Sequence, residues 1–346
     1  MKKFQKYFSK KLITWYLTAK RNLPWREISD PYKIWISEII LQQTRVNQGI
    51  NYYIRFIDKF ENLEKLANST EQEVLKVWEG LGYYRRALHL FETAKKIHFE
   101  LNGEFPRKVQ DLLKLKGIGA YTARAIASLA FGEQVAVVDG NVFRVISRLM
   151  NDFTPIDIPS NKAHYQTIAD GLLADNDSAI FNQAMIELGA LICSPTNPKC
   201  SQCPVNEYCM AFKNNTISEL PVTNKTKPKK IRYFDFYWIE NKQSMVLIKQ
   251  QEGFGFWKGL WILPCKEVQS FESEAIMNNE IGRIRHIFTH FTMQIRLVSI
   301  NYRTYKKLPN EIWVSLNEIK NDYPLPKAIH KLLTMKHKQN LFNATP

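Results

Sequence analysis

The hydrophobic pattern of the chain changes its period near residue 220, and this change limits the fold more than any other feature. Up to that point apolar residues recur at helical spacing, as in residues 181–192. Beyond residues 221–232 short apolar runs alternate with polar residues. The intervening segment has two prolines, five basic residues and no acidic residue, which is typical of a linker. We therefore expect a mainly α domain over residues 1–220 and an α+β domain over residues 233–346.

Four of the five cysteines lie within 17 residues, namely Cys193, Cys200, Cys203 and Cys209. A disulfide framework uses cysteines spread along a short secreted chain, whereas a tight cluster in a longer chain indicates metal binding. Four thiolates on one loop can hold either a tetrahedral zinc ion or a four-iron cluster. The fifth cysteine, Cys265, stands apart, and we expect it to be a buried, inert thiol.

A glycine turn precedes a second feature that can carry chemistry. Gly117 and Gly119 flank one residue, and residues 120–131 then follow a helical pattern, which predicts a helix-hairpin-helix. Glycines let a backbone approach a phosphate closely, and the N–H groups that open the next helix favour an anion. Further along, an apolar run leads to Asp139 at the start of another predicted helix. We expect Asp139 to cap that helix and to have a lowered pKa there.

Glu38 is the second candidate carboxyl group. In a helix its same-face neighbours include Ile34, Trp35 and Leu41, all apolar. Desolvation on such a face raises the pKa of a carboxyl group, so that it can hold a proton near neutral pH. The alternative is an ion pair of Glu38 with Arg45 or a solvent-facing lysine, and the apolar flanks disfavour it.

These motifs together resemble the helix-hairpin-helix DNA glycosylase superfamily. The cysteine spacing is similar to that of the [4Fe-4S] loop in the endonuclease III and MutY group. Residues 23–26, 31–45, 80–87 and 181–185 resemble the corresponding stretches of MutY-type adenine DNA glycosylases. Tyr121 stands where endonuclease III-like members carry the lysine that forms a Schiff base. The resemblance therefore implies a monofunctional enzyme that only removes the base.

The resemblance implies excision of adenine mispaired with 8-oxoguanine or guanine, in base excision repair, by a protein that carries a [4Fe-4S] cluster. Glu38 would protonate the adenine and later activate water, and Asp139 would stabilise the sugar cation. The resemblance further implies that the four clustered cysteines bind the cluster and that Tyr121 and Asn141 orient the sugar. Arg26 and Gln183 would bind the adenine. Gln43 and Tyr83 would contact the base stack near the opposing base, and Gly117 and Gly119 would contact the DNA backbone.

The C-terminal residues predict strands at 233–239 and 245–249 and a last helix at 327–335. Residues 259–264 and 285–291 resemble the Nudix-like recognition domain of MutY enzymes. No acidic Mg²⁺-binding motif follows residue 264, so we do not expect pyrophosphohydrolase activity. Where the family carries a Phe-Ser-His loop, this chain has Phe-Thr-His, which implies that Thr289 and His290 read the opposing base.

Charge points to the same class of partner. Lys and Arg number 48 against 33 Asp and Glu, and residues 221–346 hold 20 of the basic and 10 of the acidic residues. Such an excess favours a polyanion. No apolar run approaches the ~20 residues of a membrane helix. We expect a cytoplasmic monomer, associated with the nucleoid in a bacterium, that binds double-stranded DNA carrying A:8-oxoguanine or A:G mispairs and no membrane.

Two other functions remain open at this stage. An endonuclease III-like glycosylase/lyase would act on oxidised pyrimidines, but Tyr121 and the C-terminal domain argue against it. A noncatalytic iron–sulfur module would bind DNA only, and the presence of both Glu38 and Asp139 argues against it.

Overall fold

The computed structural model describes residues 2–224, 228–252, 256–271 and 279–343. The chain divides into two compact units. The first unit comprises Met1–Lys65 and Glu92–Thr226, and the second unit comprises Leu66–Phe91 and Lys227–Pro346. The segment Leu66–Phe91, which the sequence analysis assigned to the N-terminal domain, thus groups with the C-terminal residues.

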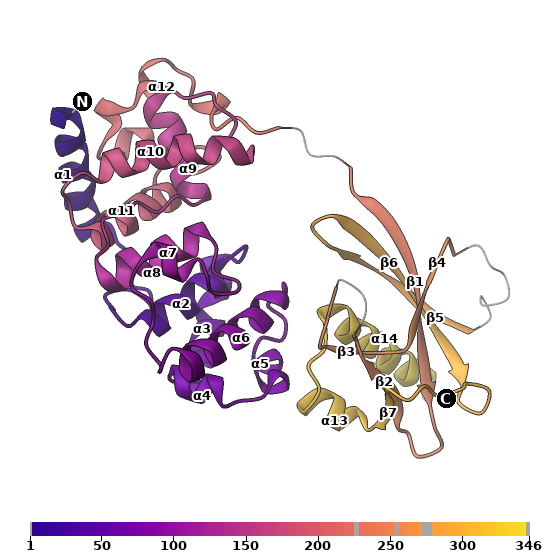
Figure 1. Ribbon diagram of the computed structural model, residues 1–346. Coiled ribbons are helices and arrows are strands. Elements are labelled where there is room, and N and C mark those ends of the chain that lie inside the picture. Colours follow the sequence, from indigo (N-terminus) through magenta and orange to yellow (C-terminus); the bar gives the residue numbers. More distant parts are fainter. Residues whose placement is uncertain (1, 225–227, 253–255, 272–278, 344–346) are drawn as a thin grey trace. The chain divides into compact units, whose positions relative to one another are not determined.

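The first unit is helical, which confirms the expected mainly α class (Figure 1). Its helices are α1 (Lys2–Ala19), α2 (Pro31–Leu41), α3 (Val46–Lys59), α7 (Val109–Leu112), α8 (Ala120–Phe131), α9 (Gly140–Met150), α10 (Lys162–Leu173), α11 (Ser178–Leu191) and α12 (Met210–Lys213). The described part of this unit also contains four 3₁₀ turns, at Pro159–Asn161 (η1), Cys200–Gln202 (η2), Asn206–Tyr208 (η3) and Ile217–Glu219 (η4). Two further helices cross between the units, α4 (Leu63–Ala67) and α6 (Arg85–Glu100).

Local signals in the sequence set where these helices begin and end. Asp30 caps α2 by accepting hydrogen bonds from two backbone N–H groups, and Pro31 follows at the first helical position. Gly132 ends α8 in the left-handed conformation, at φ 67°. Helix α11 packs against α1, α8 and α9, and its apolar face, including Phe181 and Leu188, is buried in the core of the unit.

The second unit contains a mixed sheet, which confirms the expected α+β class. Its strands are β1 (Lys230–Glu240), β2 (Val246–Gln250), β3 (Trp261–Ile262), β4 (Cys265–Val268), β5 (Glu280–Ile287), β6 (Phe291–Asn301) and β7 (Glu311–Val314). The sheet order is β3-β2-β1-β6-β5, while β4 also pairs with β1 and β7 with β2. Strands β1 and β6 are parallel over their whole length, and the other pairs are antiparallel.

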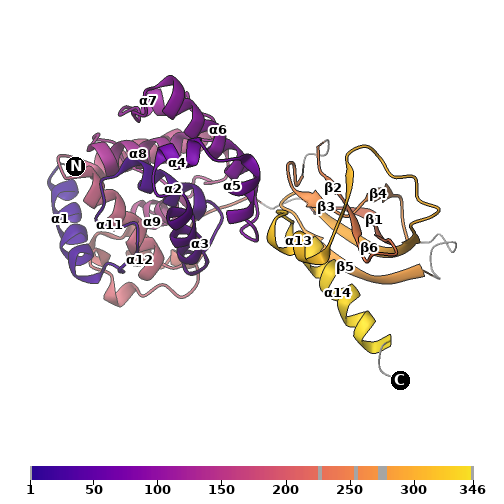
Figure 2. The ribbon, with the colours of Figure 1, turned by 90° about the horizontal axis from the view of Figure 1, so that it is seen from below.

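The described residues of this unit also form the helices α5 (Glu71–Val77), α13 (Leu316–Asn321) and α14 (Lys327–Asn343). Helix α14 packs along β5 (Figure 2). The approach is close at Gly282, where an added Cβ would lie 2.5 Å from the Met335 sulfur. Inside the sheet a buried ion pair joins the parallel strands, because Arg296 Nε donates to Asp235 Oδ1 at 2.8 Å.

The predicted linker is shorter than expected, because Lys230, Ile231 and Arg232 begin β1. Arg232 is paired with Glu267 at 2.6 Å, so an acidic side chain from outside this segment offsets one of its five basic residues. Lys225 and Lys227, which belong to the same basic segment, lie outside the described residues. Among the helices that the structure describes, none combines the length and the apolar character needed to cross a bilayer.

Candidate active site

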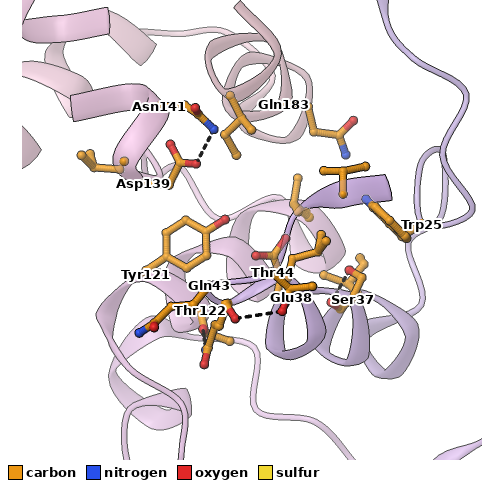
Figure 3. Close-up of a pocket in the computed structure, with 18 of the residues that line it drawn as sticks. Trp25, Ser37, Glu38, Gln43, Thr44, Tyr121, Thr122, Asp139, Asn141 and Gln183 are labelled. Carbon is orange, nitrogen blue, oxygen red and sulfur yellow. Dashed lines mark hydrogen bonds between the residues drawn. The ribbon is translucent and has the colours of Figure 1, made fainter. Parts of the chain in front are cut away.

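A cavity of about 860 Å³ opens in the first unit and collects half of the predicted site residues (Figure 3). Glu38 reaches it from α2, Tyr121 from the first turn of α8, Asp139 and Asn141 from the start of α9, and Gln183 from α11. Arg26, Gln43 and Gly119 also line it. The site is thus assembled from helix ends and helix faces that lie far apart in the sequence.

Glu38 has the raised pKa that the sequence predicts. Burial in the cavity wall raises the pKa of its carboxyl group to about 7. The neighbouring Tyr121 side chain lowers that pKa in part through hydrogen bonding, and the charge of Asp139 raises it further. At neutral pH Glu38 can therefore both hold and release a proton.

Asp139 caps α9 as predicted, but its pKa moves in the opposite direction to the prediction. Its Oδ1 accepts a hydrogen bond from the Val142 backbone N–H at 2.7 Å, and its Oδ2 accepts from Asn141 Nδ2 at 2.9 Å. These contacts lower the pKa of Asp139, yet burial outweighs them and the net shift is upward. The expectation of a lowered pKa is wrong because the sequence shows the cap and not the depth of the cavity.

Tyr121 lies between the two carboxyl groups in Figure 3. Burial, together with the charges of Glu38 and Asp139, raises the pKa of its phenol well above the ordinary value. Tyr121 is therefore a protonated hydrogen-bond donor at neutral pH. The preceding turn places it there, because Gly117 has φ 78° and Gly119 is the residue that caps α8.

Two residues that the sequence analysis missed hold Asn141 in place. Arg144 Nη2 donates to Asn141 Oδ1 at 2.9 Å and to the Gly189 carbonyl at 2.8 Å. Gly189 allows the close approach of α11 to α9, since an added Cβ would lie 2.5 Å from the Asn141 Cβ and 3.1 Å from its Cα. The available signal was an isolated glycine inside a helical pattern, which often marks a packing requirement.

The residues predicted to read the opposing base lie in the second unit. The Tyr83 hydroxyl and Thr289 Oγ1 are 3.1 Å apart and share a hydrogen bond. Tyr83 has φ 50°, a left-handed conformation that is uncommon for a tyrosine. Thr289 and His290 are exposed, and the adjoining Phe288 ring stacks on Phe291 at 4.4 Å. The predicted common location of Gln43 and Tyr83 stays a prediction.

The four clustered cysteines surround a small cavity beside η2, η3 and α12. Arg148, which is 2% exposed, donates to the Cys193 sulfur at 3.4 Å and to the Ser194 carbonyl at 2.8 Å. In the part of the chain that the structure describes, no three His, Cys, Asp or Glu side chains are grouped to hold a metal ion. A [4Fe-4S] cluster does not need such a group, because each thiolate binds a different iron atom. Four thiols around one cavity therefore fit a cluster of this kind.

Cys265 lies apart from this loop, as the sequence analysis expected. It is partly buried, and burial raises the pKa of its thiol to about 11. A thiol with such a pKa stays protonated at neutral pH, which fits the expected inert role.

Comparison with known proteins identifies three families along the chain. Residues 36–155 match the HhH-GPD superfamily of base excision DNA repair proteins, residues 193–209 match the iron-sulfur binding domain of endonuclease III, and residues 236–335 match the NUDIX domain. The adenine DNA glycosylase of Buchnera aphidicola subsp. Schizaphis graminum is 33% identical over 94% of this chain and 97% of its own. The Homo sapiens adenine DNA glycosylase is 43% identical over 59% of this chain and 39% of its own. A thermostable thymine-DNA glycosylase structure is 31% identical, with a TM-score of 0.57 over 62% of this chain and 98% of its own.

Proposed function

This chain belongs to the family of adenine DNA glycosylases, and from this membership we propose that it excises adenine paired with 8-oxoguanine or guanine in double-stranded DNA. The enzyme hydrolyses the N-glycosyl bond of adenine in base excision repair. The observation that carries the proposal is the pair of carboxyl groups in one cavity, Glu38 with a pKa of about 7 and Asp139 at a helix N-terminus, with Tyr121 between them.

The proposed reaction begins with a flipped adenine, because its glycosidic bond is out of reach inside the duplex. Protonated Glu38 donates its proton to N7, so that the base leaves neutral and the sugar develops oxocarbenium character. The carboxylate form of Asp139 stabilises that cation, and Tyr121 and Asn141 orient the sugar. Glu38, now a carboxylate, takes a proton from the water that adds to C1′. The proton lost to the base is thereby restored to the acid.

We propose that the enzyme is monofunctional. A lyase needs an amine that forms a Schiff base with the sugar, and position 121 is Tyr. Among the described residues that line the cavity, the one lysine is Lys162, at the start of α10. It is exposed, and in this proposal it forms no covalent bond with the sugar. Strand cleavage should therefore require added alkali.

Recognition of the opposing base is assigned by this proposal to the second unit. The support is the hydrogen bond between Tyr83 and Thr289, which places a hydroxyl pair beside the exposed His290. Lys229 Nζ donates to the Phe288 carbonyl at 2.8 Å, which holds the turn before Thr289. A hydroxyl can both donate and accept, as discrimination between 8-oxoguanine and guanine requires.

The chain carries the iron–sulfur loop of its relatives and binds a [4Fe-4S] cluster. We propose Cys193, Cys200, Cys203 and Cys209 as the ligands, because these four thiols surround one cavity. The cluster lies in a structural loop, and no step of the proposed base release passes through it. The proposal also includes a monomeric state and a cytoplasmic location, at the nucleoid in a bacterium.

The proposed function is tested with duplexes that carry A:8-oxoguanine, A:G or thymine glycol, assayed with and without alkali. Adenine release from the first two, with strand breaks only after alkali, is the expected result. Asp139→Asn should abolish release yet keep binding, because it removes the charge that opposes the sugar cation. Borohydride trapping that disappears in Lys162→Gln would overturn the monofunctional assignment, and cleavage of thymine glycol would favour the lyase.

A further inference from the structure

A hydrogen-bond network behind the cavity fixes one of its polar side chains. Gln183 Oε1 accepts from the Tyr16 hydroxyl at 2.5 Å and from Arg26 Nη1 at 2.9 Å. Arg26 Nη1 also donates to the Tyr16 oxygen at 2.7 Å. Tyr16 is 3% exposed, whereas Gln183 lines the cavity. The three groups form a closed triangle in which every distance is that of a hydrogen bond.

The chemistry of this triangle allows one orientation of the Gln183 amide. Arginine can only donate hydrogen bonds, so the atom of Gln183 that faces Arg26 must be the carbonyl oxygen. The Tyr16 oxygen accepts from Arg26, which leaves the Tyr16 proton to donate to the same carbonyl. A reversed amide would bring its N–H₂ group against the N–H of Arg26. The Gln183 nitrogen consequently points toward the cavity, as Figure 3 shows.

Glu187 holds Arg26 in this position from the opposite side. Its side chain is 0% exposed, and Oε2 accepts from Arg26 Nη2 at 2.9 Å and from Arg21 Nη2 at 2.8 Å. The other oxygen accepts from the Arg21 backbone N–H and Nε. Burial alone would raise the pKa of Glu187, but the hydrogen bonds and charges of the two arginines outweigh it and hold the pKa below its usual range. Glu187 is therefore a permanent anion that orients Arg26.

We propose that Tyr16 and Glu187 are positioning residues that fix the Gln183 amide as a hydrogen-bond donor to a ring nitrogen of the flipped base. This inference rests on the proposed adenine excision. A flipped base is read on its Watson–Crick edge, where adenine N1 is an acceptor and guanine N1 carries a hydrogen. An N–H₂ group held in this direction can donate a hydrogen bond to N1 of adenine. In guanine it would meet the hydrogen on N1 instead. Without Tyr16, the carbonyl oxygen of Gln183 would be held by Arg26 alone, so the amide could tilt and its nitrogen would be a poorer donor to the base.

The test compares adenine with 1-deazaadenine, each opposite 8-oxoguanine, in single-turnover excision by the full-length protein. The wild type should act about tenfold more slowly on the analogue, since the Gln183 donor is left without an acceptor. Tyr16→Phe should slow adenine release by about fivefold and leave the rate on the analogue nearly unchanged. Gln183→Met should not discriminate between the two bases. Adding Tyr16→Phe to Gln183→Met should not slow base release any further.

The matched control is Tyr165→Phe. Tyr165 belongs to the same buried cluster as Tyr16, and its hydroxyl donates to the Thr154 carbonyl at 2.6 Å. This variant should keep the wild-type ratio of the two rates. Glu187→Gln provides a second variant, because it removes the negative charge that orients Arg26, and it should reduce the ratio of the two rates as Tyr16→Phe does.

Equal slowing of both bases by Tyr16→Phe, or the same loss in the Gln183→Met background, would overturn the positioning role. A wild-type protein that releases no adenine from any mispair would instead overturn the proposed function. The rate of adenine release by the wild-type protein therefore distinguishes a failure of the proposed function from a failure of the positioning role.

Discussion

At the scale of single residues, the two carboxyl groups of the cavity show how burial and hydrogen bonding compete. Glu38 has apolar neighbours and one phenol beside it, so burial dominates and the pKa rises to about 7. Asp139 has an amide and a backbone N–H as donors, and its pKa still rises. The rise at Glu38 was predictable from residues three and four positions away. The rise in the pKa of Asp139 was not predictable, because it depends on a cavity wall built by segments that lie far apart in the sequence.

The raised pKa of Glu38 predicts the pH dependence of base release. Glu38 acts as an acid only when protonated, so the rate constant should fall as the pH rises through about 7, by about tenfold for each further unit. Single-turnover rates on an A:8-oxoguanine duplex between pH 5 and 9 measure this. A rate that keeps increasing up to pH 9 would show that Glu38 is not the acid.

The same pKa predicts a stability effect of Glu38→Gln. A group whose pKa is higher in the folded protein stabilises it fully below its unfolded value, near 4.5, and this stabilisation is lost as the pH rises through about 7. Gln carries no charge, so at pH 8 the free energy of unfolding of the variant should exceed that of the wild type by up to about 3 kcal/mol. Urea unfolding at pH 5 and pH 8 compares the two proteins. An equal difference at both pH values would contradict the assignment.

At the scale of secondary-structure elements, the crossing of α9 and α11 positions Asn141, which we propose as a catalytic group. Gly189 lets the two helices touch beside Asn141, and Arg144 ties Asn141 to the Gly189 carbonyl. Helical spacing predicted both helices, and the apolar residues of α11 are buried as expected. The spacing gave no measure of the distance between the helices, because that distance depends on which residues meet at the crossing.

Gly189→Ala should push the start of α9 away from α11. The added methyl group meets the Asn141 backbone, which cannot move as a flexible side chain does, so we expect a loss of about 1–3 kcal/mol in stability and of at least about tenfold in base release. Gly171→Ala is the control, since its methyl group would meet only the side-chain end of Gln5 in another helix. That variant should be as stable as the wild type or slightly more so. Identical behaviour of the two variants would contradict this account of the crossing.

The cysteine loop depends on a second helix contact, from Arg148 in α9. Arg148 donates to three backbone carbonyls, of Ser194, Pro195 and Leu220, and to the Cys193 sulfur. Arg148→Met keeps an unbranched apolar stem but leaves these buried carbonyls without a donor, so the variant should retain less iron than the wild type and unfold at a lower temperature. Iron content per chain measures the first effect. Cys200→Ala is the reference for a lost cluster, and full iron content in Arg148→Met would contradict the prediction.

At the scale of the whole molecule, the change of hydrophobic period predicted two domains but not their membership. The segment Leu66–Phe91 is helical and precedes more helices, so nothing in its pattern separates it from the first unit. Its placement depends on polar contacts made across the chain. Glu79 accepts from the Leu325 backbone N–H and pairs with His330, and the Tyr84 hydroxyl donates to the Leu325 carbonyl. Contacts between residues so far apart in the chain leave no signal in the local sequence pattern.

A chain that ends at Pro221 should separate base release from recognition of the opposing base. It keeps every residue of the cavity but loses Thr289 and the partners of Glu79 and Tyr84. We expect adenine release opposite guanine to persist, the preference for 8-oxoguanine to disappear, and the melting temperature to fall. Full-length Thr289→Ala is the control, since it removes the partner of Tyr83 alone. A fragment that still prefers 8-oxoguanine would place recognition in the first unit, for example at Gln43.

The division of the second unit between two stretches of chain has a consequence for synthesis. Residues 66–91 leave the ribosome more than a hundred residues before the strands and helices that contact them. The polar groups of this segment therefore stay hydrated, without their native partners, while the rest of the first unit is synthesised. Closing so long a loop is slow, and the carboxyl-terminal segment around Leu325 and His330 is what closes it. Premature termination near the end of the message would thus leave a defect close to its beginning.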